Sequence, residues 1–128
     1  MTIAEWMILV AVLVYLLTLA PFKPLGHREF DNARPRAPAF YAEPLRARAL
    51  GAHLNGIETF PFFAAAVLLA EFRHTPQDWI DGLSVAFVLL RLAFVAAYLL
   101  NFAWTRTVIW NLGFAVNVAI FFAPWWTH

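Results

Sequence analysis

The sequence predicts an all-α membrane protein, a bundle of four transmembrane helices, and three observations support this fold class. Hydrophobic residues make up 62% of the 128 residues and charged residues only 13%, and the mean hydropathy is +0.67. Long apolar runs alternate with short polar segments, and each run has about the length that a bilayer requires. The six tryptophans lie at or near the ends of these runs, as in the aromatic belts of membrane proteins.

The first predicted span covers residues 3–20, an apolar run with few polar side chains. A secretory signal peptide is the alternative interpretation. The residues before the run include no Lys or Arg, which the first region of a signal peptide requires. We therefore expect a membrane-spanning helix at this position.

A polar, proline-containing loop over residues 21–50 follows the first span. It carries six of the nine basic residues, which are Lys23, Arg28, Arg34, Arg36, Arg46 and Arg48. Because basic residues accumulate in cytoplasmic loops, this loop is predicted to be cytoplasmic. The two chain termini are then expected on the opposite side of the membrane.

Three further spans are predicted at residues 50–72, 79–101 and 108–124. Residues 73–76 form a short turn on the side of the termini, and residues 102–107 form a second cytoplasmic loop. The whole chain, residues 1–128, is expected to be a single four-helix transmembrane domain without repeats.

The second span carries an unusual stripe of polar residues. At about 100° per residue, Arg48, Gly51, Asn55 and Glu58 fall within roughly 80° of one helix face. An ionised Glu58 would lie inside the hydrocarbon region, where a charge without a partner costs several kcal/mol. The stripe therefore predicts a partner for Glu58 on a neighbouring helix.

The third span offers that partner. Arg91, Phe94, Tyr98 and Asn101 recur at helical spacing on one face. Because the second and third spans run in opposite directions, Glu58 and Arg91 fall at similar depths. We expect the two to pair and to share one water-accessible cavity that faces the cytoplasm.

Simpler structural roles are the alternative for each of these residues. The Glu58 and Arg91 pair could serve only to fix the helix register, and Asn55 could make an ordinary hydrogen bond between helices. Anchoring at the membrane surface is the alternative for Arg48 and Arg106. We interpret His53 as an interfacial side chain and Asn111 and Asn117 as packing residues. The convergence of several polar groups favours a binding site.

Composition excludes several other classes of function. The net charge is +1 and the basic residues are dispersed, so the chain has no electrostatic footprint for nucleic acid. There are no cysteines, and the four histidines (His27, His53, His74 and His128) are scattered, so no metal site is predicted. A pocket with arginines, an amide, a carboxylate and a phenol suits a small zwitterionic or anionic ligand.

The second span also carries a recognisable motif. The stretch RALGAHLNGIETFPFFAA, residues 48–65, resembles the signature of the MAPEG family (membrane-associated proteins in eicosanoid and glutathione metabolism), in its bacterial branch. The matching residues are Arg48, Ala52, His53, Asn55, Glu58, Pro61, Phe63 and Ala64. The length, the four spans, the polar first loop and Arg91 with Tyr98 on the third span are similar to the family as well.

The resemblance implies a homotrimer in the bilayer that binds glutathione as a co-substrate between adjacent subunits. By motif position, the glutathione contacts would be Arg48, Asn55, Glu58, Arg91 and Tyr98, and Arg106 would be the catalytic residue that stabilises the thiolate. The implied function is a transferase or peroxidase that delivers this thiolate to a hydrophobic small-molecule substrate. A bacterial inner membrane would be its location.

Two residues depart from the family pattern. Gly51 stands where several family enzymes have a ligand-binding arginine, and Phe94 replaces the first tyrosine of an R-x-x-Y-x-x-x-Y motif. A non-catalytic ligand-binding or scaffold protein of the same fold is therefore an alternative. A small multidrug transporter is a third hypothesis, but those proteins have their essential glutamate in the first span.

Overall fold

The computed structural model describes the chain except residues 26–27 and 128. Two of the four histidines that were predicted to be scattered, His27 and His128, therefore lie outside the described residues. The described residues form helices and connecting turns, without a strand, which confirms the all-α prediction. The elements are α1 (Ile3–Leu19), α2 (Phe22–Leu25), η1 (Phe40–Ala42), α3 (Pro44–Phe72), α4 (Gln77–Leu99) and α5 (Ala103–Trp126).

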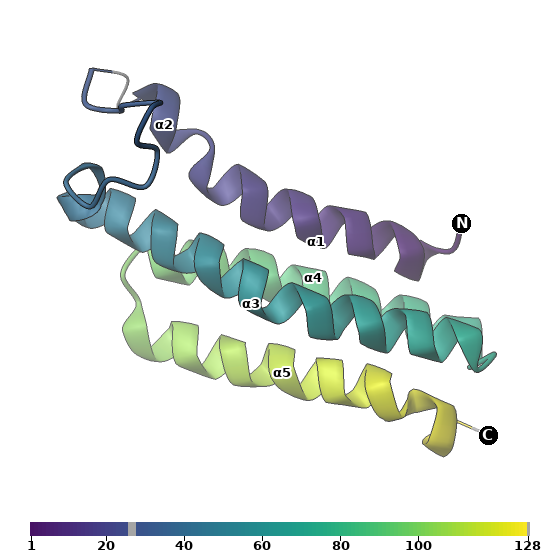
Figure 1. Cartoon of the computed structure of the whole chain (residues 1–128). Coiled ribbons are helices and arrows are strands. Elements are labelled where there is room, and N and C mark those ends of the chain that lie inside the picture. Colours follow the sequence, from purple (N-terminus) through teal and green to yellow (C-terminus); the bar gives the residue numbers. More distant parts are fainter. Residues whose placement is uncertain (26–27, 128) are drawn as a thin grey trace.

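The four long helices pack side by side, and each runs antiparallel to the one before it (Figure 1). Helices α3 and α4 lie at the centre: both contact α1, and both contact α5. The two termini and the α3–α4 turn are at one end of the bundle (Figure 1). The polar loop after α1 and the α4–α5 turn are at the other end.

Three of the long helices, α3, α4 and α5, have the length and apolar composition to cross a membrane. Helix α1 is also apolar but has 17 residues. At about 1.5 Å per residue it extends roughly 25 Å, somewhat less than the hydrocarbon thickness of about 30 Å. The structure thus supports an integral membrane protein.

Helix α3 begins at Pro44, six residues before the span predicted from residue 50, so the predicted loop over residues 21–50 is shorter than expected. The Glu43 carboxylate accepts hydrogen bonds from the backbone N–H groups of Leu45 and Arg46, at 3.0 and 2.9 Å. Pro44 occupies the first turn, where its missing N–H costs nothing. The prediction followed hydropathy, whereas this cap sets the start of the helix.

Helix α5 also begins early, at Ala103, so the predicted loop over residues 102–107 is mostly helix. Asn101 adopts a left-handed conformation (φ 63°) just beyond α4. The N–H groups of Asn101 and Phe102 then donate to the carbonyls of Tyr98 and Ala97, the pattern of a Schellman motif. Because this motif needs so few residues, α5 starts at once and Arg106 lies in its first turn.

The same motif explains why Asn101 leaves the polar face of the third span. The prediction placed it in line with Arg91 and Tyr98, but it lies in the turn after α4 and is exposed. His74 adopts the same left-handed conformation after α3, with φ 56°. The N–H groups of His74 and Thr75 donate to the carbonyls of Glu71 and Ala70. Both turns therefore place a non-glycine residue in the left-handed region.

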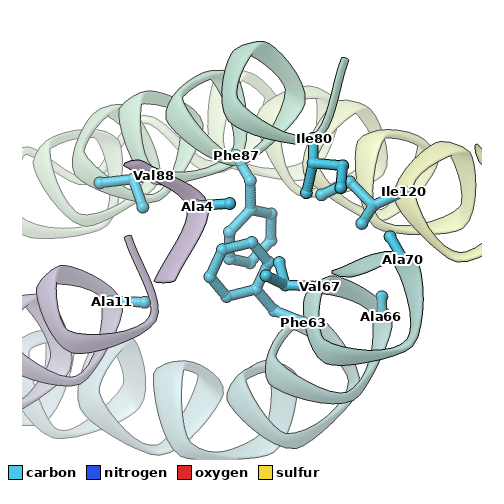
Figure 2. Packing of buried hydrophobic residues seen from close by; sticks show 10 residues of the cluster. All are labelled: Ala4, Ala11, Phe63, Ala66, Val67, Ala70, Ile80, Phe87, Val88 and Ile120. Atoms are coloured by element: carbon cyan, nitrogen blue, oxygen red, sulfur yellow. The ribbon is translucent and has the colours of Figure 1, made fainter. Parts of the chain in front are cut away.

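The apolar core lies where α1, α3, α4 and α5 meet. Phe63 and Phe87 stack at its centre, with ring centroids 4.2 Å apart (Figure 2). Ala4 and Ala11 of α1 and Ala66 of α3 are also buried there. Side chains this small let membrane helices approach closely, which is how such helices gain packing energy.

Candidate functional site

Helices α3 and α4 bring Asn55 and Arg91 together. Nη1 of Arg91 donates to Oδ1 of Asn55 at 2.9 Å, and the Arg91 guanidinium lies 4.3 Å from the centre of the Phe94 ring. Arg91 is only 6% exposed. An amide dipole and an aromatic face therefore replace water around this buried cation.

The predicted ion pair between Glu58 and Arg91 is wrong. Neither residue forms a salt bridge within the described part of the chain. Glu58 lies three residues after Asn55, which places it about 60° round the helix from the α4 contact. Asn55 takes the position beside Arg91, and Glu58 is exposed on the surface of the single chain.

A groove of about 440 Å³ lies between α3, α4 and the start of α5. Its polar wall consists of Asn55, Glu58, Tyr98, Arg106 and Thr107, and its other lining residues are Gly51, Leu54, Phe94 and Trp110. We call this space the groove. It contains one potential cation, the Arg106 guanidinium, and one carboxylate, Glu58.

Arg106 is held over Tyr98. Its guanidinium carbon lies 4.3 Å from the centre of the Tyr98 ring, and Phe94 meets that ring edge-on with centroids 5.6 Å apart. A cation over an aromatic face keeps its outer N–H groups free to donate to a ligand. Because α5 begins at Ala103, this arginine projects from a helix and not from a loop.

Gly51 is needed for the position of Tyr98. A Cβ atom at residue 51 would lie 2.3 Å from the Tyr98 hydroxyl oxygen and 2.7 Å from the ring carbon that carries it. The phenol therefore occupies the space of the missing side chain. This contact gives a physical reason for the departure from the family pattern at Gly51.

A second, smaller cavity of about 190 Å³ lies between α3, α4 and α5. We call it the chamber. It shares Asn55, Glu58 and Trp110 with the groove. Its remaining lining residues are Thr59, Phe62, Phe87, Leu90, Arg91, Ile109, Gly113, Phe114 and Asn117. Glu58 and Arg91 therefore both line the chamber, although the two do not pair; the opening of this cavity toward water and the cytoplasm stays a prediction.

The predicted site residues separate into four groups. Tyr98 and Arg106 line the groove, Arg91 lines the chamber, and Asn55 and Glu58 line both. Arg48 is not among the lining residues of either cavity. Its Nε donates to the Leu99 carbonyl at 3.1 Å, which satisfies a free carbonyl at the end of α4.

His53 lies on another side of α3, toward α1. Its Nδ1 donates to the Tyr15 carbonyl at 2.7 Å, and the two rings meet edge-on at 5.8 Å. This residue links two helices and does not line the groove or the chamber. In the described residues, no group of His, Asp and Glu side chains could hold a metal ion.

Helix α5 contributes lining residues beyond Arg106 that were not predicted from the sequence. Trp110, Gly113 and Asn117 line the chamber. Together with Arg106 they recur at spacings of four, three and four residues, which places all of them on one helix face. That spacing was available in the sequence, but Asn117 was interpreted as a packing residue.

These features define an α-helical membrane protein with a polar groove and a second, smaller cavity between its helices. The family model of the MAPEG family matches residues 3–126, so the chain belongs to the MAPEG family. This confirms the resemblance that the second-span motif predicted. No curated protein and no solved structure matches the chain.

Proposed function

We propose that this protein is a glutathione-dependent membrane enzyme, a transferase or peroxidase, and that glutathione binds in the groove. The observation that carries the proposal is the Arg106 guanidinium over Tyr98, in a space that Asn55 and Glu58 also line. Glutathione is a peptide thiol with carboxylates and an ammonium group. Arg106 supplies a donor for anionic groups, and Glu58 and Asn55 supply acceptors for N–H groups.

The chemical part of the proposal assigns thiolate stabilisation to Arg106. A nearby guanidinium favours the charged form of a thiol, and the thiolate is the nucleophile. In the transferase reaction the sulfur forms a bond to an electrophilic carbon, and the leaving group departs with its bonding electrons. In the peroxidase reaction two glutathione molecules reduce one hydroperoxide to an alcohol and water and become a disulfide.

A homotrimer is part of the same proposal. Glu58 is exposed on a helix long enough to span a membrane, and Leu54 and Ile57 beside it are 47% and 43% exposed. A carboxylate facing lipid tails is costly, whereas a carboxylate facing another protein surface or a water-filled cavity is tolerated. This cost favours a second copy of the chain against this face of α3.

The proposed orientation places the polar loop and the α4–α5 turn in the cytoplasm of a bacterial inner membrane. The two segments lie at the same end of the bundle, opposite the termini (Figure 1). Seven of the nine basic residues lie at this end, which fits the positive-inside rule: Lys23, Arg28, Arg34, Arg36, Arg46, Arg48 and Arg106. The groove would then open near the cytoplasmic surface, where a soluble peptide thiol is available.

Two measurements on the detergent-solubilised protein test the proposal. Calorimetric titration should detect glutathione binding, and mixing should produce the ultraviolet absorbance of a thiolate at neutral pH. Arg106→Ala should abolish the thiolate signal. Arg73→Ala is the matched control, because Arg73 also lies over an aromatic ring, Trp125 at 5.7 Å, at the other end of the bundle.

The outcomes separate the hypotheses. Absence of glutathione binding at millimolar concentration would refute the proposed function. Binding without a thiolate signal would favour the non-catalytic alternative. An undiminished thiolate signal in Arg106→Ala would remove Arg106 from its proposed role.

A further inference from the structure

A third cavity, of about 550 Å³, lies between α1 and α4 in the half of the bundle that carries the polar loop. We call it the α1–α4 cleft. It shares no lining residue with the groove or the chamber, and none of its lining residues belongs to α3. A second copy of the chain against the exposed face of α3 therefore need not cover it. Its lining includes Val10, Leu13, Leu17, Phe22, Leu92 and Leu99.

The cleft forms because α1 and α4 are in close contact at one end and leave open space toward the other. Near the N-terminus the Ala4 N–H donates to Oδ1 of Asp81 on α4 at 2.8 Å, and Ala4 is fully buried. From Val10 onward, valines and leucines of the two helices line the cleft instead. Side chains that border a gap lose dispersion contacts, so a group that fills the gap is favoured.

The walls of the cleft suit hydrocarbon. Thr18 is the one polar residue of the lining, and its hydroxyl already donates to the Val14 carbonyl at 2.6 Å. Leu17 and Leu92 are 62% and 49% exposed, so the cleft is open to the bilayer. A polar ligand would lose its hydrogen bonds to water on these walls, whereas an acyl chain has none to lose.

The length of the cleft is close to the depth of one leaflet. Along α1 the lining extends from Val10 to Thr18, about 12 Å at 1.5 Å per residue, and Pro21 and Phe22 continue it beyond the helix. One leaflet provides half of a hydrocarbon thickness of about 30 Å. A lipid of the leaflet nearest the polar loop can therefore place a chain in the cleft with its headgroup near Phe22.

Basic side chains lie near the headgroup end of the cleft. Nε of Arg48 donates to the carbonyl of Leu99, a lining residue, at 3.1 Å, and its other N–H groups can donate to a phosphate. Lys23 directly follows Phe22 but lines a neighbouring cavity, so it contributes charge and no contact in the cleft. Neither cation forms an ion pair with any residue that the structure describes. The two charges favour a headgroup with net negative charge.

We propose that the α1–α4 cleft holds one acyl chain of a phospholipid with an anionic headgroup, and that Arg48 binds the phosphate of this lipid. The chain fills the space between α1 and α4 in the half of the bundle that lacks the contact made by Ala4. The lipid is a bound component of the protein and takes no part in the proposed reaction. Because it binds the folded bundle, it should also raise Tm.

Native mass spectrometry of the detergent-solubilised protein tests the headgroup preference. The protein is incubated with equal amounts of dioleoyl phosphatidylglycerol and dioleoyl phosphatidylcholine, which differ only in the headgroup. Phosphatidylglycerol should be retained in preference, and Arg48→Gln and Lys23→Gln should each reduce this preference by about fivefold. Arg73→Gln is the matched control, because Arg73 lies at the other end of the bundle and should leave the preference unchanged.

Two neighbouring leucines of α1 test the position of the chain. Leu17→Trp adds bulk in the cleft and should abolish the retention of both lipids, together with the rise in Tm that phosphatidylglycerol gives. Leu16→Trp is the matched control, because Leu16 is also exposed, at 46%, but does not line the cleft. This variant should retain both lipids as the wild type does.

Equal retention of the two lipids by the wild type would refute the anionic preference. Equal behaviour of Leu17→Trp and Leu16→Trp would indicate only the general lipid shell and would refute the site. A changed number of subunits in Leu17→Trp would assign the cleft to a second copy of the chain, and would also overturn the proposal. A thermal melt of each variant without added lipid verifies the fold. Glutathione titration is a separate measurement: lipid retention without glutathione binding refutes the proposed function alone, and normal glutathione binding without lipid retention refutes only the lipid site.

Discussion

Removal of the Asn55 amide is expected to destabilise the bundle, because it leaves the Arg91 cation buried without its hydrogen bond. Arg91 is 6% exposed and its one hydrogen bond to another described side chain is the 2.9 Å contact to Asn55. A hydrogen bond to a charged group contributes about 1.5–3 kcal/mol. The nearby Phe94 ring still offers a cation–π contact. Asn55→Leu should therefore lower the free energy of unfolding by roughly 2 kcal/mol.

Removal of the arginine instead of the amide should lower the free energy of unfolding by a smaller amount. In Arg91→Met the buried charge is gone and the apolar side chain fills much of the same volume. Asn55 lines the groove, so water can reach its amide. We expect a loss of about 1 kcal/mol for Arg91→Met, because an amide that can be hydrated avoids most of the desolvation penalty.

The double variant Asn55→Leu/Arg91→Met removes both partners and should be more stable than Asn55→Leu alone. Thermal unfolding in detergent, followed by circular dichroism, gives the four values of a double-mutant cycle. The expected coupling is at least 1 kcal/mol, which corresponds to several degrees in Tm for a chain of this size. Strictly additive effects would show that the two side chains do not interact energetically, and would refute this account of the buried arginine.

Two further predictions concern Gly51 and Glu43. Gly51→Ala should displace Tyr98 and lower Tm, since its Cβ would lie 2.3 Å from the phenol oxygen. Addition of Tyr98→Leu to this variant should restore Tm. An unchanged Tm in Gly51→Ala would contradict the contact. The backbone N–H groups of Leu45 and Arg46 hold the pKa of the Glu43 carboxyl below its ordinary value. Because the folded pKa is lowered, the carboxylate stabilises the first turn of α3 above the ordinary pKa, and this contribution is lost as the pH falls through the folded pKa. Hydrogen exchange of residues 44–50, corrected for intrinsic rates, should therefore be faster in Glu43→Gln than in wild type at neutral pH and equal in strongly acidic buffer, and a difference that persists in acid would argue against the charged cap.

The ends of the helices were predicted less accurately from local sequence patterns than the apolar runs themselves. Hydropathy located the apolar runs but placed the second helix at residue 50, although the structure starts it at Pro44. The signal was present in the sequence as an acid followed by a proline, which is a favourable helix start. The early start of α5 depended on Asn101 in the left-handed conformation, which many residues disfavour and which the prediction did not anticipate.

For the candidate site, the sequence predicted several of the lining residues but not which of them pair. Helical spacing placed Asn55 and Glu58 on α3 and Arg91 and Tyr98 on α4, and these residues do line the two cavities. The choice of partner was wrong, because equal depth made Glu58 appear opposite Arg91. A rotation of about 60° between Asn55 and Glu58 decides which of them faces α4.

Composition, apolar run lengths and the motif that begins at Arg48 thus determined by themselves that this is a helical membrane protein of the MAPEG family. The tertiary structure alone decided that Asn55 pairs with Arg91, that Tyr98 fills the space beside Gly51, and that Gly113 and Asn117 border a chamber. The physical reason is that the period of a helix specifies which residues share a face and how deep they lie. The rotation of each helix against its neighbours follows from packing among all of them, which no single segment contains.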